Sequence, residues 1–155
     1  MKTNKMVIVL ISVVILMCSL VGCSSKTAID ADTFVKTMYA ENFTVTDVTN
    51  EIETNGLVTS LLVASNENYE IEFYVLTDNN TAASIFHNSK ESYDDEYSVR
   101  TTSLSVTLGN YSYYAFVADG GFHMIARIDN TMLWCDANKA YKDEIIALVE
   151  KLGYK

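Results

Sequence analysis

The chain is poor in the residues that mark several common classes of protein. It has 155 residues, with no proline, six glycines, three cysteines and one tryptophan. The lack of proline and the scarcity of glycine exclude collagen-like repeats and Pro/Gly-rich low-complexity segments, and three cysteines are too few for a disulfide-dense miniprotein. Only residues 6–21 form a long uncharged apolar run, which excludes several membrane spans. What remains is one globular domain preceded by a targeting segment.

The targeting segment has the order of a secretory signal. Two lysines lie within residues 1–5, residues 6–21 follow without charge, and the segment ends in Leu20-Val21-Gly22-Cys23. These last four residues resemble the lipobox of bacterial lipoproteins. The resemblance implies that the Cys23 thiol becomes a thioether to diacylglycerol and that the peptide bond before Cys23 is cut. The alternatives are an uncleaved membrane helix, for which the run is short, and ordinary secretion with cleavage elsewhere.

Lipidation of Cys23 would hold the rest of the chain on the extracytoplasmic side of the cell membrane. Two acyl chains suffice for a stable anchor. Residues 24–30 separate Cys23 from the first patterned segment and reach at most about 25 Å when fully extended. We therefore predict a signal peptide in residues 1–22, a short tether in residues 23–30 and a single domain in residues 31–155, close to the lipid surface.

The predicted mature chain is strongly acidic. The whole chain has 20 Asp plus Glu against 11 Lys plus Arg, a formal net charge of −9, and removal of Lys2 and Lys5 with the leader would make it −11. Such a charge repels nucleic-acid phosphates and anionic head groups, so nucleic acid is not an expected partner. A solvated surface is a plainer use of these carboxylates than the capture of a specific cation.

The spacing of apolar residues predicts an α+β domain with about three helices and about six to seven strands. Helices are predicted over residues 31–42, from Asp78 into the polar stretch 90–96, and over 138–152. Strands are predicted over residues 43–54, 57–64, 69–76, 99–108, 111–118, 122–128 and 131–135. Short connections such as Asn55-Gly56, which suits a type I′ hairpin turn, make the pairing antiparallel. We expect a twisted sheet with a C-terminal β-meander and helices on one face.

Catalytic and metal-binding patterns are not visible in the sequence. His87 and His123 are far apart, and neither has a Cys or a carboxylate at zinc-ligand spacing. No Gly-rich phosphate loop and no Gly-x-Ser-x-Gly elbow occurs. The run Asp94-Asp95-Glu96 could bind calcium, but such a run is more often a solvated loop. We therefore expect no catalytic residues, no metal and no cofactor.

The cysteines leave no disulfide in the predicted mature chain. Cys18 would leave with the leader and Cys23 would carry the lipid, so Cys135 has no partner within the chain. Cys135 follows Trp134 in an apolar stretch, which favours a small buried hydrophobic residue over a nucleophile.

Aromatic residues gather in the predicted meander. Tyr111, Tyr113, Tyr114 and Phe116 lie on one strand, and Trp134 follows two strands later. Alternation puts Tyr111 and Tyr113 on one face of the sheet, and Tyr114 and Phe116 on the opposite face. An uncovered face would form a platform suited to sugars or peptides, whereas packing under helices would bury the rings.

Two hypotheses of function follow from these patterns. The first is a non-enzymatic, lipid-anchored extracytoplasmic domain that binds or modulates a protein or glycan partner near the membrane. The second is a small-ligand or glycan-binding lipoprotein that uses an aromatic sheet face formed by Tyr111, Tyr113, Tyr114 and Trp134.

Overall fold

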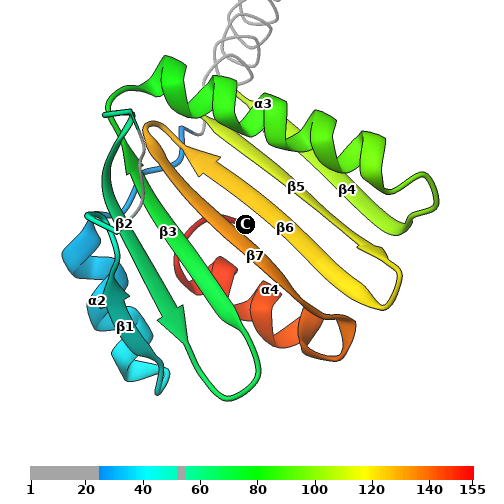
Figure 1. The fold of residues 1–155 in the computed structure, drawn as a ribbon, viewed down its shortest axis with the longest axis horizontal. Coiled ribbons are helices and arrows are strands. Elements are labelled where there is room, and N and C mark those ends of the chain that lie inside the picture. Colours follow the sequence, from blue (N-terminus) through cyan, green and yellow to red (C-terminus); the bar gives the residue numbers. More distant parts are fainter. Residues whose placement is uncertain (1–24, 52–54) are drawn as a thin grey trace, which may run out of the picture.

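The computed structural model describes residues 25–51 and 55–155, which form one antiparallel sheet with helices on both faces (Figure 1). The sheet has seven strands in the spatial order β1-β2-β3-β7-β6-β5-β4. The predicted α+β class and antiparallel pairing are confirmed. The predicted signal peptide, the lipobox with Cys23, and the last part of the predicted strand 43–54 lie outside the described residues.

The helices are α2 (Ala31–Ala40), α3 (Asn79–Glu96) and α4 (Lys142–Lys151), and a short 3-10 turn, η1 (Lys139–Tyr141), precedes α4. The strands are β1 (Thr44–Asp47), β2 (Val58–Ser65), β3 (Glu70–Leu76), β4 (Thr101–Leu108), β5 (Tyr111–Ala118), β6 (Gly121–Ile128) and β7 (Thr131–Asn138). Strands β4 to β7 form the predicted meander.

Local sequence signals set where the helices begin. The Asp30 carboxylate accepts a hydrogen bond from the Thr33 amide at 2.7 Å and caps α2. Asp78 caps α3 in the same way, accepting from the amides of Asn80 and Thr81. Each cap gives a partner to backbone amides that the first turn of a helix otherwise leaves unbonded. The predicted starts of both helices are therefore correct, and α3 includes the polar stretch 90–96.

The backbone turns follow the Asn, Asp and Gly residues. Asn55 and Gly56 have φ angles of 50° and 73°, the two positive angles that a type I′ turn requires. Strand β1 is shorter than predicted and ends at Asp47, whose carboxylate accepts hydrogen bonds from the amide and hydroxyl of Thr49. This side-chain turn competes with the strand for the Thr49 amide.

The helices cover both faces of the sheet, so our expectation of one covered face was wrong. Helices α2 and α4 pack on one face, where Phe34 of α2 stacks on Phe73 of β3 with ring centroids 4.7 Å apart. Helix α3 packs on the other face, where Phe86 and Tyr93 belong to a second core. The physical reason is that consecutive side chains of β5 and β6 are apolar, so both faces of these strands must be buried.

The segment before α2 is held on the domain. Lys26 Nζ donates to the carbonyl oxygens of Gly153 and Lys155 at 3.0 and 2.9 Å, and Asn110 Nδ2 donates to the Lys26 carbonyl at 2.7 Å. Ile29 packs against the core under α2 and α4. Most of the predicted tether 23–30 thus lies along the domain surface.

Candidate functional site

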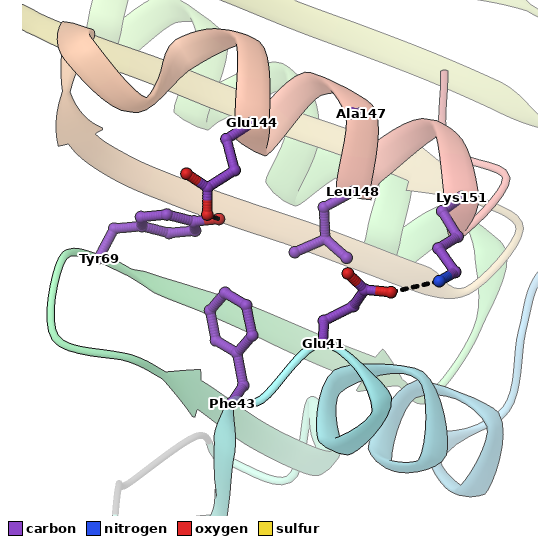
Figure 2. A pocket seen from close by; sticks show the side chains of 7 residues that line it. All are labelled: Glu41, Phe43, Tyr69, Glu144, Ala147, Leu148 and Lys151. Atoms are coloured by element: carbon purple, nitrogen blue, oxygen red, sulfur yellow. Dashed lines mark hydrogen bonds and ion pairs between the residues drawn. The ribbon is translucent and has the colours of Figure 1, made fainter.

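A pocket of about 230 Å³ opens between the end of α2 and α4, and we call it the α2–α4 pocket (Figure 2). It is lined by Glu41, Phe43, Tyr69, Glu144, Ala147, Leu148 and Lys151. The chain reverses after α2 at Asn42, whose φ angle is 64°. Because asparagine tolerates this left-handed conformation, the reversal can bring Phe43 against the pocket directly before β1.

Aromatic rings form one wall of the α2–α4 pocket. Phe43 and Tyr69 meet edge to face, with centroids 5.4 Å apart and ring planes at 64°. Figure 2 shows both rings opposite α4, which contributes Leu148 from above. Phe43, Tyr69 and Leu148 are all buried to more than nine-tenths. The wall is therefore rigid, because its rings are already fixed by packing.

Charged groups stand at the two ends of the pocket. Tyr69 Oη donates to Glu144 Oε1 at 2.9 Å at one end, and Lys151 forms an ion pair with Glu41 at the other (Figure 2). Burial, together with the adjacent Glu144 carboxylate, raises the pKa of the Tyr69 phenol, which stays protonated and donates at neutral pH. The three charged side chains carry a formal charge of −1. The pocket thus combines an apolar wall with a net negative rim.

The α2–α4 pocket was not predicted from the sequence. Its residues come from three separate segments: residues 41–43 between α2 and β1, Tyr69 directly before β3, and α4. Each residue alone has an ordinary role, such as a helix-surface glutamate or a core aromatic. Only the packing of α2 beside α4 on the same face of the sheet brings these segments together.

The structure buries the three tyrosines of the predicted aromatic platform. Tyr111 and Tyr113 lie in the core under α2 and α4, and Tyr114 lies under α3, with 7%, 1% and 2% exposure. These rings form no open platform, because both faces are covered where they lie. Trp134 is half-buried and lines a smaller, apolar pocket of about 120 Å³ beside α3. The remaining lining residues of that pocket are Val58, Tyr74, Leu76, Ile85 and Met132.

His123 has a carboxylate partner that the sequence did not reveal. Its Nδ1 lies 2.8 Å from Oδ1 of Asp136, which is directly opposite it across the β6–β7 pair. The Asp136 carboxylate also accepts from Tyr93 Oη at 2.7 Å and from Trp134 Nε1 at 3.2 Å. The His123 ring stacks on Phe116 with centroids 4.8 Å apart. His123 is thus held in place by its neighbours, and the shared Asp136 carboxylate links Tyr93 of α3 to the sheet.

The carboxylate of Asp94 is engaged by neighbouring side chains. Arg100, Lys90 and Tyr114 all donate to it, the last at 2.7 Å. Burial alone would raise the pKa of Asp94, but these hydrogen bonds outweigh burial and hold the pKa well below its ordinary value. Asp94 therefore ties α3 to β5 and the segment before β4. In the part of the chain that the structure describes, no three His, Cys, Asp or Glu side chains are grouped to hold a metal ion.

Asp94→Asn should lower the free energy of unfolding by about 1–2 kcal/mol at neutral pH, since hydrogen bonds to a partly exposed charge are worth that order. The native pKa of Asp94 lies below the ordinary value of about 3.9. Its carboxylate therefore stabilises the fold above that pH, and this stabilisation is lost as the pH falls further. The free energy of unfolding, measured by urea denaturation at several pH values, should decrease less toward acidic pH in the variant than in the wild-type protein. Asp95→Asn, an exposed neighbour on α3, is the control and should behave as wild type.

Cys135 is buried in the core under α2 and α4, as the sequence predicted. Burial raises the pKa of its thiol to about 12, which makes it a poor nucleophile at neutral pH. Within residues 25–51 and 55–155, no helix has the length and apolarity needed to span a membrane.

No protein-family model matches the chain, and no curated protein matches it. Among solved structures, the chain is similar to a protein of Thermotoga maritima described as a GTP binding regulator, with 17% sequence identity and a TM-score of 0.49. The alignment covers 81% of this chain and 88% of that chain. A likeness of this size transfers no function.

Proposed function

We propose that the chain is a lipid-anchored, non-enzymatic binding protein on the extracytoplasmic side of the cell membrane, and that it binds a protein partner through the α2–α4 pocket. The lipobox residues Leu20-Val21-Gly22-Cys23 support the anchor. The size and lining of the pocket support the partner. The alternative, a small-ligand or glycan site on the aromatic sheet face, now rests on Trp134 alone.

The volume of the α2–α4 pocket is the main support for a protein partner. Small-molecule sites usually measure about 300–1,000 Å³, whereas this pocket has about 230 Å³. A space of that size suits one side chain projecting from a larger partner. An interface commonly concentrates its binding energy in such a buried anchor side chain.

The lining of the pocket selects a basic side chain with an apolar stem. Phe43, Tyr69 and Leu148 offer contact to methylene groups, and the aromatic faces attract a cation. Glu144 can pair with the cation, since its only hydrogen-bond partner among the described residues is the neutral Tyr69 phenol. An arginine fits best, because its guanidinium binds a carboxylate through two parallel hydrogen bonds and stacks on aromatic rings.

Lipidation is tested on the protein isolated from bacterial membranes. We expect mass spectrometry to find an N-terminal peptide that begins at Cys23 and carries a diacylglyceryl group. Cys23→Ser should remain uncleaved and unmodified at that position. A retained leader, or an unmodified Cys23 thiol in the wild-type protein, would contradict the anchor.

Pocket binding is tested by an NMR titration with N-acetyl-arginine amide and, as a neutral probe of the same shape, N-acetyl-citrulline amide. We expect saturable shifts near Tyr69 and Leu148 with the arginine compound only. Glu144→Gln should weaken binding about tenfold, the loss of a charged hydrogen bond. Lys151→Ala should tighten it, because removing this cation frees Glu41 and makes the rim more negative. Equal responses to both compounds would exclude the proposed selectivity.

A further inference from the structure

Several turns of the chain meet at one end of the sheet, and we call this end the anchor end. The amide of Asp129 donates to the Asn110 carbonyl at 2.9 Å, and the Leu76 amide donates to the Asn130 carbonyl at 2.8 Å. The Thr77 amide donates to the Leu57 carbonyl at 3.0 Å. The anchor end thus comprises Lys26, Leu57, the turn 108–110 and the turn 129–130.

Lys26 is fixed to the anchor end by several independent contacts. Asn110 donates to its carbonyl, its Nζ donates to the carbonyls of Gly153 and Lys155, and the same Nζ lies 4.5 Å from the centre of the Tyr111 ring. Cys23 precedes Lys26 by three residues in the sequence. Three residues span at most about 11 Å when fully extended. A lipid on Cys23 would therefore hold the anchor end close to the bilayer.

The anchor end exposes apolar side chains on two sides. Leu108, at the end of β4, is 62% exposed, and Leu57, before β2, is 46% exposed. The turns between them carry the short polar residues Asn110, Asp129 and Asn130. Exposed leucines beside polar turns gain free energy by entering the boundary between lipid head groups and acyl chains.

We propose that the anchor end is a membrane-contacting surface, with Leu57 and Leu108 toward the lipid and the strands directed away from the bilayer. The proposal rests on the lipid anchor of the proposed function and goes beyond it, because an anchor alone leaves the orientation of the domain free. The lipidated Cys23, the short link to Lys26 and the exposed leucines all favour the same end of the sheet.

This orientation places the Tyr69 and Glu144 end of the α2–α4 pocket away from the lipid. Tyr69 lies directly before β3, whose other end, Leu76, is hydrogen-bonded at the anchor end. Seven strand residues span about 23 Å, so the aromatic wall stands well clear of the head groups. A partner could then reach Glu144 from the aqueous side, while the membrane covers the opposite end of the domain.

The orientation is tested by placing a fluorophore at either end of β4 in the lipidated protein. Leu108→Cys labels the anchor end, and Val99→Cys labels an exposed aliphatic residue, 78% accessible, beyond the other end of the same strand. The lipid blocks Cys23 and burial protects Cys135, so the label goes to the introduced thiol. Both proteins are reconstituted in phosphatidylcholine vesicles containing a lipid with a spin-labelled head group.

We expect strong quenching of the Leu108→Cys label and little quenching of the Val99→Cys label, because quenching needs the head group close to the label and β4 is about 26 Å long. Adding Leu57→Ser to each labelled variant should reduce the difference in quenching between the two labels, while the protein stays on the vesicles. Equal quenching at both ends, or stronger quenching at Val99, would overturn the orientation. Mass spectrometry of the same samples separates this failure from absence of the lipid, which would overturn the anchor itself.

Discussion

Cys135 in the native protein should react with N-ethylmaleimide about a thousandfold more slowly than in the chain unfolded by guanidinium chloride. Burial raises the pKa of the thiol from 9.0 to about 12, and each pKa unit lowers the thiolate fraction at neutral pH about tenfold. Burial also blocks the approach of the reagent to the sulfur. Intact-protein mass spectrometry over time measures both rates.

The same labelling experiment reports on Cys23. A lipidated and cleaved protein has Cys135 as its one unmodified cysteine, so native samples should show almost no early adduct. Asp95→Cys, an exposed position on α3, is the control and should react at the rate of a free thiol. Rapid modification of the wild-type protein, mapped to Cys135, would contradict the buried position. Rapid modification mapped to Cys23 would instead contradict lipidation.

Phe34→Ala should lower the free energy of unfolding by about 3–5 kcal/mol, the usual cost of removing a buried aromatic ring from a core. Phe34 is fully buried, and its ring is stacked on Phe73 with centroids 4.7 Å apart. The substitution leaves a cavity between α2 and the sheet that the helix cannot fill by moving without losing its other contacts. Urea denaturation followed by circular dichroism measures the change.

Tyr39→Ala is the matched control for Phe34→Ala, because Tyr39 lies on the same helix and is 58% exposed. A surface substitution of this kind should change the free energy of unfolding by about 0.5 kcal/mol or less. Similar losses in the two variants would show that α2 contributes through its surface and not through the core. A loss in the Phe34 variant alone supports the packing of Phe34 on Phe73.

Local features of the fold were predictable because each depends on residues close in sequence. Asp30 and Asp78 cap helices through amides two or three positions away, and Asn55-Gly56 adopts the two positive φ angles that its residue types favour. The meander also followed from short connections, since two-residue turns allow only antiparallel neighbours. These signals need no knowledge of the rest of the chain.

Features that depend on the packing of distant segments were not predictable. In β5 and β6, apolar side chains occupy positions that point to both faces of the sheet, which could have indicated two covered faces. Alternation alone, however, does not say which helix lies on which face. The α2–α4 pocket joins three segments, and the pairing of His123 with Asp136 depends on the register of the β6–β7 hairpin. The attachment of Lys26 to Gly153 and Lys155 links the two extremes of the described chain.

The pairing of β3 with β7 bears on the proposed export of the chain. Strand β3 lies in the middle of the sheet, yet one of its two neighbours is the last strand of the sequence, where Val75 pairs with Thr131. A polypeptide exported with its N-terminus first would expose the unpaired backbone of β3 until nearly all of it had crossed. Such an edge invites pairing with other chains. Under the proposed export, correct folding should therefore depend on rapid passage of the chain, or on a chaperone that shields β3 until the final hairpin has crossed.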